Sequence, residues 1–146
     1  MFCQIIGIAG FFMNKMSKKM EYALMALQII CQKPEGVLTS AKEVADQMHI
    51  PFEVTARVLQ ALSSRGLLRA EYGVSGGYAL ARSLSEISVH DLNEILEGHA
   101  VLTKCLDPDE ICEISATCNI TSPISNLNSK VQQFYKSISL HEVLHV

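Results

Sequence analysis

Two short helical patterns followed by a glycine-rich turn restrict the fold of this chain more than any other feature of its sequence. Ser40-Ala-Lys-Glu43 has the form of a capping box, in which the serine hydroxyl and the glutamate carboxylate satisfy backbone N–H groups at a helix start. This box predicts a short helix over residues 41–48. His49-Ile50-Pro51 interrupts the pattern, and an amphipathic helix is predicted over about residues 52–65. Its buried stripe comprises Thr55, Val58, Leu59 and Leu62. Two such helices joined by a tight turn are typical of a helix-turn-helix.

A predicted β-hairpin follows this second helix. Gly66 ends the helix, and strand-like runs occupy residues 67–72 and 78–81. Between them lies the turn Gly73-Val-Ser-Gly-Gly77, where glycine supplies the positive φ that tight turns need. Each piece alone also fits a small α/β core, but a hairpin directly after a helix-turn-helix indicates a wing. We therefore expect a mainly α fold with a small β-hairpin wing, that is, a winged helix-turn-helix domain.

Helical patterns flank the winged unit on both sides. Ser17 is the expected N-cap of a helix whose apolar residues recur over residues 20–30. Ser88-Val-His-Asp91 opens another helix, which is predicted to end at about residue 97 because Gly98 follows it. These two helices complete the predicted core of the domain.

A long helix is predicted from Ser122-Pro123 onward, followed by a short one that Ser139 caps. Its apolar residues recur at steps of three and four, as in the seam of a coiled coil. They are Ile124, Leu127, Val131, Phe134 and Ile138. We expect a dimerisation helix that also packs partly on its own domain.

The chain divides into four predicted segments. Residues 1–15 are a leader of doubtful status, residues 16–97 are the winged helix-turn-helix domain, residues 98–121 are a cysteine-rich loop, and residues 122–146 are the dimerisation helix with a C-terminal tail. The leader contains an apolar run from Phe2 to Met13 that is too short to span a bilayer. It is either a weak anchor or the product of an upstream translation start, with the second interpretation favoured, and its Cys3 receives no role.

Three cysteines gather in the loop: Cys105, Cys112 and Cys118, with six and then five residues between them. Loops that collect several soft thiolates hold a metal or act as a redox switch. The residues alone leave an iron–sulfur cluster, zinc and a disulfide switch nearly even, although zinc sites more often show close cysteine pairs. Five cysteines in total, an odd number with three in one loop, do not resemble a secreted disulfide framework and favour the reducing cytoplasm.

Charge is distributed unevenly along the chain. Residues 1–82 carry nine Lys and Arg against six Asp and Glu, a net of +3, whereas residues 83–146 carry three against nine, a net of −6. This asymmetry indicates that the first half meets a polyanion such as double-stranded DNA.

The order of these elements resembles the IscR/NsrR family of iron–sulfur transcriptional regulators, over about residues 16–144. The motifs that carry the resemblance are Tyr22-Ala23, Arg65-Gly-Leu-Leu68, Gly76-Gly-Tyr-Ala-Leu80, Ile87-Ser-Val89 and the three spaced cysteines. The resemblance implies a homodimer that binds palindromic promoter sites, with the helix of residues 52–65 in the major groove and the wing tip in the minor groove.

The resemblance also implies a ligand set for an iron–sulfur cluster, either 2Fe-2S or 4Fe-4S. IscR-like members have a histidine three residues after the third cysteine, where this chain has Thr121. NsrR-like members use an acidic residue next to the Tyr-Ala pair of the first helix, which is Glu21 here and would reach across from the other subunit. The implied ligands are therefore Cys105, Cys112, Cys118 and Glu21. His99, His141 and His145 are alternative fourth ligands, the last two more simply being polar surface.

The predicted DNA contacts fall into three groups. Arg57 is the best candidate for reading a base edge, because a guanidinium pairs bidentately with guanine, and Glu53, Thr55 and Gln60 are weaker candidates. Lys42, Arg65 and Arg69 are expected to touch phosphates. Ser75, Gly76 and Gly77 at the wing tip are expected to let the backbone approach the minor groove.

The expected function is a DNA-binding transcriptional regulator, by family habit a repressor, switched by a cluster that senses nitric oxide, redox state or iron–sulfur status. The first alternative is a regulator without a cluster that switches by thiol oxidation. The second is an enzyme, which the sequence disfavours because no nucleophile–base–orienter set or phosphate-binding glycine loop can be assembled from it.

Overall fold

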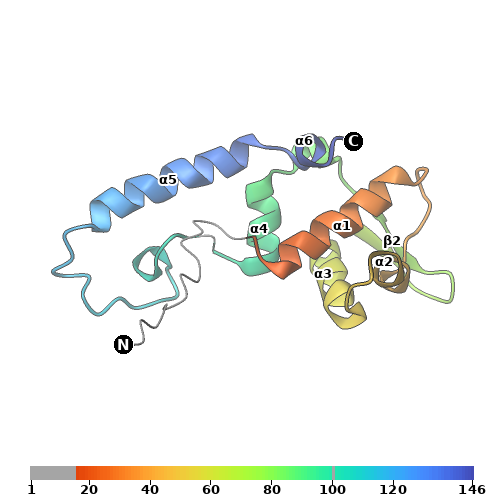
Figure 1. The fold of residues 1–146 in the computed structure, drawn as a ribbon, viewed down its shortest axis with the longest axis horizontal. Helices are drawn as coiled ribbons and strands as arrows, with labels where there is room; N and C mark the ends of the chain where they lie inside the picture. Colours follow the sequence, from red (N-terminus) through yellow and green to blue (C-terminus); the bar gives the residue numbers. More distant parts are fainter. Residues whose placement is uncertain (1–15, 100) are drawn as a thin grey trace, which may run out of the picture.

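The computed structural model describes residues 16–99 and 101–146, and the predictions for residues 1–15 lie outside this range. The chain folds into a winged unit with a long helix that extends away from it (Figure 1). Among the described residues, no helix has the length and apolar character needed to cross a membrane.

Three helices build the winged unit: α1 (Lys18–Gln32), α2 (Ala41–Met48) and α3 (Phe52–Ser64). The Ser17 hydroxyl accepts a hydrogen bond from the N–H of Met20, which confirms the expected cap of α1. The predicted capping box at α2 forms only in part. The Ser40 hydroxyl accepts from the N–H of Glu43, but the Glu43 carboxylate contacts Lys33 Nζ at 2.5 Å. Since Lys33 comes from the loop after α1, this pair ties the loop to α2.

The wing is an antiparallel pair of short strands, β1 (Leu68–Glu71) and β2 (Gly77–Leu80). Leu68 is paired with Leu80 and Glu71 with Gly77, which leaves a tight tip between the strands. Thr39 adds a bridge on the other edge of β2, because its N–H and C=O both bond to Tyr78 at 2.9 Å. The hairpin is therefore anchored to the segment that leads into α2.

A single core lies among α1, α2, α3 and the hairpin. Its fully buried side chains include Leu27, Val44, Leu59, Leu62 and Leu92. Leu92 belongs to α4 (Val89–Glu97), which follows a short 3-10 turn at Leu84–Glu86. A complete capping box starts α4: the Ser88 hydroxyl accepts from the N–H of Asp91 and the Asp91 carboxylate accepts from the N–H of Ser88. This is the serine-to-acid pair expected there.

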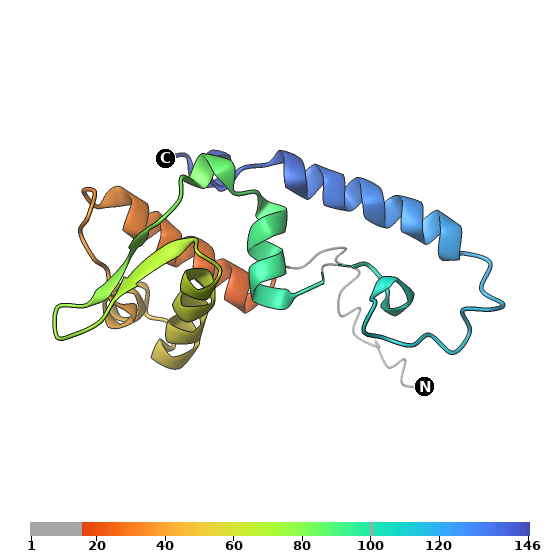
Figure 2. The same ribbon diagram turned by 180° about the vertical axis from the view of Figure 1, so that it is seen from behind.

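The long helix is α5 (Thr121–Ser137), and the short helix α6 (Leu140–Leu144) follows it. The prediction that Ile138 continues the α5 stripe as a helical residue is wrong, because Ile138 is extended and forms the C-cap. The turn between α5 and α6 is held by the start of α4, since the N–H of Val89 donates to Ile138 and the N–H of Leu140 donates to Ile87. Leu140 is fully buried. Figure 2 shows α5 leaving the winged unit from this joint.

Candidate DNA-reading surface and cysteine loop

The outer face of α3 presents most of the predicted base-reading residues. Glu53, Arg57 and Gln60 are exposed, whereas Val58, Leu59 and Leu62 are buried as predicted. This arrangement leaves one cation, one carboxylate and one amide free to meet a ligand along the helix.

Thr55 is not a DNA contact in this arrangement, contrary to its place among the predicted candidates. Its side chain is 0% exposed, and its hydroxyl donates to the carbonyl oxygen of Pro51 at 2.8 Å. The hydroxyl thus satisfies the backbone at the start of α3, and no face of the residue reaches solvent.

Phe52 joins the exposed face although its spacing suggests otherwise. It precedes Thr55 by three residues and Leu59 by seven, which is the spacing of the buried stripe. The structure nevertheless leaves it 54% exposed at the first position of the helix. Phe52 is not among the predicted contacts, and its spacing gives no signal that it is exposed.

The candidate phosphate contacts differ in their surroundings. Lys42 and Arg65 are exposed at the start of α2 and the end of α3. Arg69 on β1 is exposed too, but its guanidinium lies 3.3 Å from the Glu71 carboxylate. A surface pair of this kind contributes little free energy, so Arg69 can exchange Glu71 for another anion.

The two glycines of the wing, Gly76 and Gly77, have internal reasons to be glycine. A Cβ on Gly76 would overlap the carbonyl oxygen of Glu71 across the turn. A Cβ on Gly77 would lie 2.8 Å from the backbone of Thr39, closer than real Cβ contacts come. These two glycines therefore allow close approach between parts of the chain itself, independently of any contact with DNA. The residues that project from the tip are Ser75 together with Tyr72 and Val74, which sequence reasoning missed; Tyr72 is 97% exposed.

The cysteine loop has little regular structure. Cys105 lies in a 3-10 turn (Lys104–Leu106), and Cys112 and Cys118 lie in the irregular part that follows. All three thiols are free and partly exposed. The loop is tied to α5 at its start, where the N–H of Leu102 donates to Asn128 Oδ1 at 3.0 Å.

Cys118 has a distinct electrostatic environment. The Thr121 hydroxyl beside it, followed by the backbone N–H of Ile120, lowers the pKa of its thiol from the ordinary value. Among the described residues, this buried hydroxyl makes no hydrogen bond of ordinary geometry, with Cys118 or any other group. By contrast, burial raises the pKa of Cys31 in α1, whose thiol bonds to the carbonyl oxygen of Gln28. This contrast fits a reactive loop thiol and a structural helix thiol.

The described residues of one protomer do not bring the predicted ligands together. Among residues 16–99 and 101–146, no three His, Cys, Asp or Glu side chains form a group that could hold a metal ion. Glu21 lies in the first turn of α1, where Lys18 Nζ contacts its carboxylate at 2.6 Å. The donor chemistry still fits an iron–sulfur cluster in part, since the loop offers three of the four ligands, all thiols, that such clusters take.

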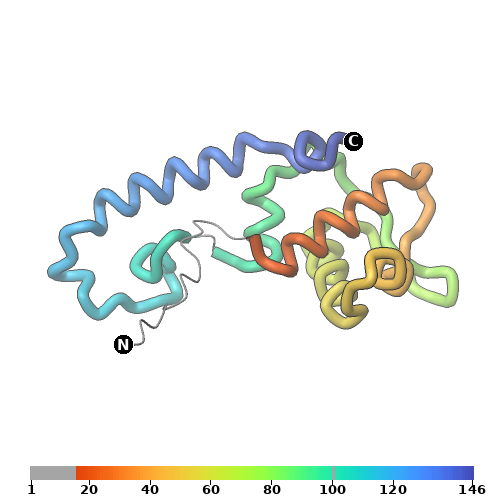
Figure 3. Tube along the Cα trace, viewed as in Figure 1, coloured from red at the N-terminus to blue at the C-terminus, as the bar shows by residue number. Residues whose placement is uncertain are grey.

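The alternative histidine ligands lie in different places. His99 lies at the start of the loop, and its Nε2 is 3.8 Å from the Asp109 carboxylate. His141 and His145 belong to α6 and its C-cap, at the opposite end of α5 from the loop (Figure 3). A helix of 17 residues is about 25 Å long, which separates these two from the thiols of the same protomer.

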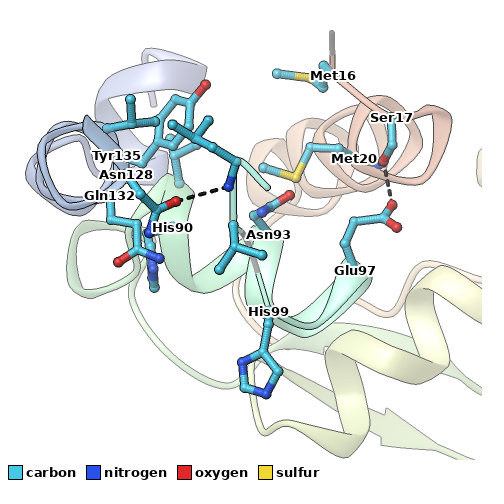
Figure 4. Close-up of a pocket in the computed structure, with 14 residues that line it drawn as sticks. Met16, Ser17, Met20, His90, Asn93, Glu97, His99, Asn128, Gln132 and Tyr135 are labelled. Atoms are coloured by element: carbon cyan, nitrogen blue, oxygen red, sulfur yellow. Dashed lines mark hydrogen bonds between the residues drawn. The ribbon is translucent and has the colours of Figure 1, made fainter. Parts of the chain in front are cut away.

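A cavity of about 370 Å³ lies where the winged unit, the loop and α5 meet. Figure 4 shows Met20 and Glu97 on one side of it and Gln132 and Tyr135 on the other. Ser17 Oγ donates to Glu97 at 2.6 Å and Lys19 Nζ lies 3.4 Å from the same carboxylate, which joins the start of α1 to the end of α4.

The apolar stripe of α5 is only partly covered. None of the 17 residues of α5, all within the described range, is fully buried. Ile124 and Val131 are half-buried, whereas Leu127 and Phe134 are 43% and 62% exposed. Contact with α4 covers part of the stripe, so α5 packs partly on its own domain. The exposed residues leave apolar surface for a partner, as the second predicted role requires.

Comparison with known proteins places this geometry among transcriptional regulators. A family model described as Rrf2, iron-dependent transcriptional regulator, matches residues 16–146. A protein of Aquifex aeolicus (strain VF5) named as an HTH-type transcriptional regulator is 26% identical over 132 residues, which cover 89% of this chain and 91% of that protein.

Solved structures share the fold. The global cysteine regulator CymR (YrzC) of B. subtilis has a TM-score of 0.68 at 23% identity, covering 91% of this chain and 98% of its own. IscR of T. potens has a TM-score of 0.64 at 23% identity, covering 93% and 90%. The expected winged helix-turn-helix architecture is confirmed by these similarities.

Proposed function

Since the chain belongs to the Rrf2 family of transcriptional regulators, we propose that it is a cytoplasmic, homodimeric repressor whose affinity for palindromic promoter DNA is switched by an iron–sulfur cluster. Regulators of this family bind DNA and commonly form dimers, and they are not enzymes. The single observation that carries the finer proposal is the set of three partly exposed, free thiols on one irregular loop between the winged unit and α5.

The DNA half of the proposal uses the exposed faces of α3 and the wing. The recognition helix of a helix-turn-helix lies in the major groove with its N-terminal residues at the base edges. In this chain those residues include Glu53, Arg57 and Gln60, with Arg57 pairing with guanine. Lys42, Arg65 and Arg69 would hold the phosphates, and the tip around Ser75 would enter the minor groove.

The sensing half uses Cys105, Cys112 and Cys118 from one copy and Glu21 from the other. Three thiolates match the usual donors of an iron–sulfur cluster, and a carboxylate is a harder, weaker fourth donor that marks a labile corner. When bound, the cluster supplies a centre that exchanges electrons and responds to nitric oxide or iron supply. The family description, iron-dependent, supports this assignment.

The switch would act through the angle between the two DNA-reading units of the dimer. Ligation by Glu21 of the opposite copy would tie the loop to α1 of that copy and set this angle. Within a protomer, the bond from Leu102 to Asn128 joins the loop to α5, and the bond from Ser17 to Glu97 joins α1 to α4. Packing of α4 against α5 links the two pairs. Releasing the loop changes the half-site spacing that the dimer meets, and hence its DNA affinity.

A regulator without a cluster, switched by thiol oxidation, is the second candidate. It is favoured by the observation that the described residues of one protomer do not gather a metal-binding group. The lowered pKa of Cys118 supports it, because the thiolate is the form that oxidants attack. A solved CymR of Staphylococcus aureus is described as an oxidized form, at 21% identity and a TM-score of 0.66.

Anaerobic purification with visible absorption and iron and sulfide counts tests the sensing half. We expect a coloured protein whose iron and colour are lost in Cys112→Ala and kept in Cys31→Ala, the control thiol outside the loop. Glu21→Gln should weaken cluster retention, whereas Lys18→Ala, which breaks the same ion pair but spares the carboxylate, should not. A colourless, iron-free protein from anaerobic cells would instead favour the thiol switch.

Binding to duplexes selected from a random library tests the DNA half. Arg57→Ala should relax preference at one base pair of each half-site, at a cost of about 1–3 kcal/mol. A uniform loss on all sequences would make Arg57 a phosphate contact instead.

A further inference from the structure

The first residue of α3 carries an apolar side chain that the fold covers only in part. Phe52 is 54% exposed, whereas Ile50 and Val54 on either side of it pack against the core. More than half of the surface of Phe52 is therefore open to a ligand.

Helix initiation does not explain a phenylalanine at this position. Pro51 is the N-cap and makes no side-chain capping bond, and the Thr55 hydroxyl bonds back to Pro51. An aromatic side chain at the first helical position satisfies none of the free N–H groups there, and Phe is not a strong helix former. Helix initiation thus gives the exposed ring no role.

The polar composition of the same face leaves room for apolar recognition. Along α3 the exposed charged residues are Glu53 and Arg57, which cancel in net charge. Phosphate contacts carry no sequence information directly, so discrimination along this face would come from contacts with base edges. Ala56 stands one turn after Phe52 and adds a methyl group to the same side of the helix.

One base edge in the major groove offers an apolar group. Thymine presents its 5-methyl there, and side chains such as Ala and Phe contact it. The N-terminal residues of a recognition helix are those that reach base edges. Phe52 occupies this end of α3, one position before Glu53, which is among the residues assigned to base reading above.

We infer that Phe52, flanked by Ala56, contacts the 5-methyl group of a thymine in each half-site and is a specificity-determining residue of DNA recognition. This inference rests on the proposed DNA-binding function. It predicts that binding depends on a single methyl group at one thymine position of the site, independently of the base pair's hydrogen bonds.

Replacing thymine by deoxyuracil removes only that methyl group and keeps the base pair. The experiment uses the full-length protein and a duplex selected from a random library, with each thymine of a half-site replaced in turn by deoxyuracil, together with its symmetry mate. For the wild-type chain we expect one position at which the replacement weakens binding about fourfold per half-site, the effect of losing one buried methyl group.

Three variants connect this effect to Phe52. In Phe52→Ala the affinity for the thymine duplex should fall, and the deoxyuracil replacement at that position should change it less than about 1.5-fold, since no ring remains to contact the methyl group. Phe52→Leu keeps an apolar side chain and should retain part of the methyl effect. Tyr72→Ala removes an exposed aromatic side chain from the wing; because the methyl group lies in the major groove, the full effect should persist in this variant.

The outcomes separate this inference from the proposed function. If the duplex binds tightly but no thymine is sensitive, or if the sensitivity survives in Phe52→Ala, the assignment of Phe52 is wrong while DNA binding stands. If no duplex is bound in preference to random DNA, the proposed function fails and this inference fails with it. Thermal unfolding of each variant beside the wild type confirms that the exposed substitutions leave the fold intact.

Discussion

Residues 20–92 and residues 93–139 use their apolar side chains in different ways. The first range contains every fully buried hydrophobic residue of the described chain apart from Leu140. In the second, among residues 93–99 and 101–139, no residue is fully buried. The winged unit thus holds its own core, whereas the loop and α5 leave apolar surface uncovered. This difference is the one expected if, as proposed above, the winged unit reads DNA while the loop and α5 are completed by a second copy or a ligand.

The largest expected effect lies in the core of the winged unit. Leu62→Ala removes a fully buried side chain of α3 and should lower the free energy of unfolding by about 2–5 kcal/mol, because it leaves a cavity in a packed core. Leu127→Ala shortens a side chain of the same kind that is 43% exposed, so the stability of the isolated protomer should change far less. Urea denaturation of both variants at low protein concentration measures the contrast. Equal losses would show that α5 is as firmly packed as the core.

The next effect concerns the oligomer. Phe134→Asp places a charge on the exposed stripe of α5 and should weaken self-association at least about tenfold, since burying an unpaired carboxylate is costly. Gln133→Asp adds the same charge on an exposed position outside the stripe and serves as the control. Sedimentation over a range of concentrations reads the change, while circular dichroism checks that the winged unit persists. Identical behaviour of the two variants would remove α5 from the dimer interface.

The sequence predicts the parts of the fold that depend on local contacts and misses those that depend on contacts between distant positions. Ser17 and Ser88 were predictable as caps because a cap bonds to residues three positions away. The approach of Thr39 to Gly77 was not, because it joins positions far apart in the chain. The exposure of Phe52 was not predictable either, since periodicity describes a helix face but not where the core ends.

The candidate site likewise has residues that the sequence predicts and residues that it does not. Residue type and spacing indicated a thiolate site at Cys105, Cys112 and Cys118. The fourth ligand depends on which residues of a second copy reach the loop, and neither spacing nor a single protomer supplies that information. For α3, the exposed positions Glu53, Arg57 and Gln60 follow from helical periodicity, and Thr55 was wrongly included although the same periodicity places it in the buried stripe.

A smaller effect tests how the wing is attached to the segment before α2 within the winged unit. Gly77→Ala puts a methyl group 2.8 Å from the Thr39 backbone and should cost about 1–3 kcal/mol, because backbone on both sides resists displacement. Gly66→Ala is the matched control: its added methyl group has open space, and only the positive φ of 75° is strained. Hydrogen exchange of the Thr39 and Tyr78 amides should speed up in Gly77→Ala alone. Unchanged protection there would show that the hairpin can shift without loss.

The smallest effect lies at α4, the joint between the two regions, and depends on pH. Partial burial acts to raise the pKa of Asp91, but hydrogen bonds from the N–H and hydroxyl of Ser88 outweigh it and hold the pKa below the ordinary value. The folded state therefore favours the carboxylate. The stabilisation is present above the unfolded pKa of about 4 and is lost as the pH falls through the lower, folded pKa.

Because Asp91 is exposed, this contribution should stay below about 1 kcal/mol. Urea denaturation at about pH 6 and pH 3 should show the difference in the wild type and a smaller one in Asp91→Asn. Glu86→Gln removes a nearby exposed carboxylate without touching the capping box and is the control. The N–H of Val89 donates to the carbonyl oxygen of Ile138 across this joint. Loss of the cap should therefore also speed amide exchange at Val89 before it affects the core. If Asp91→Asn keeps the full pH dependence, the capping box does not stabilise α4 at its place between the winged unit and α5.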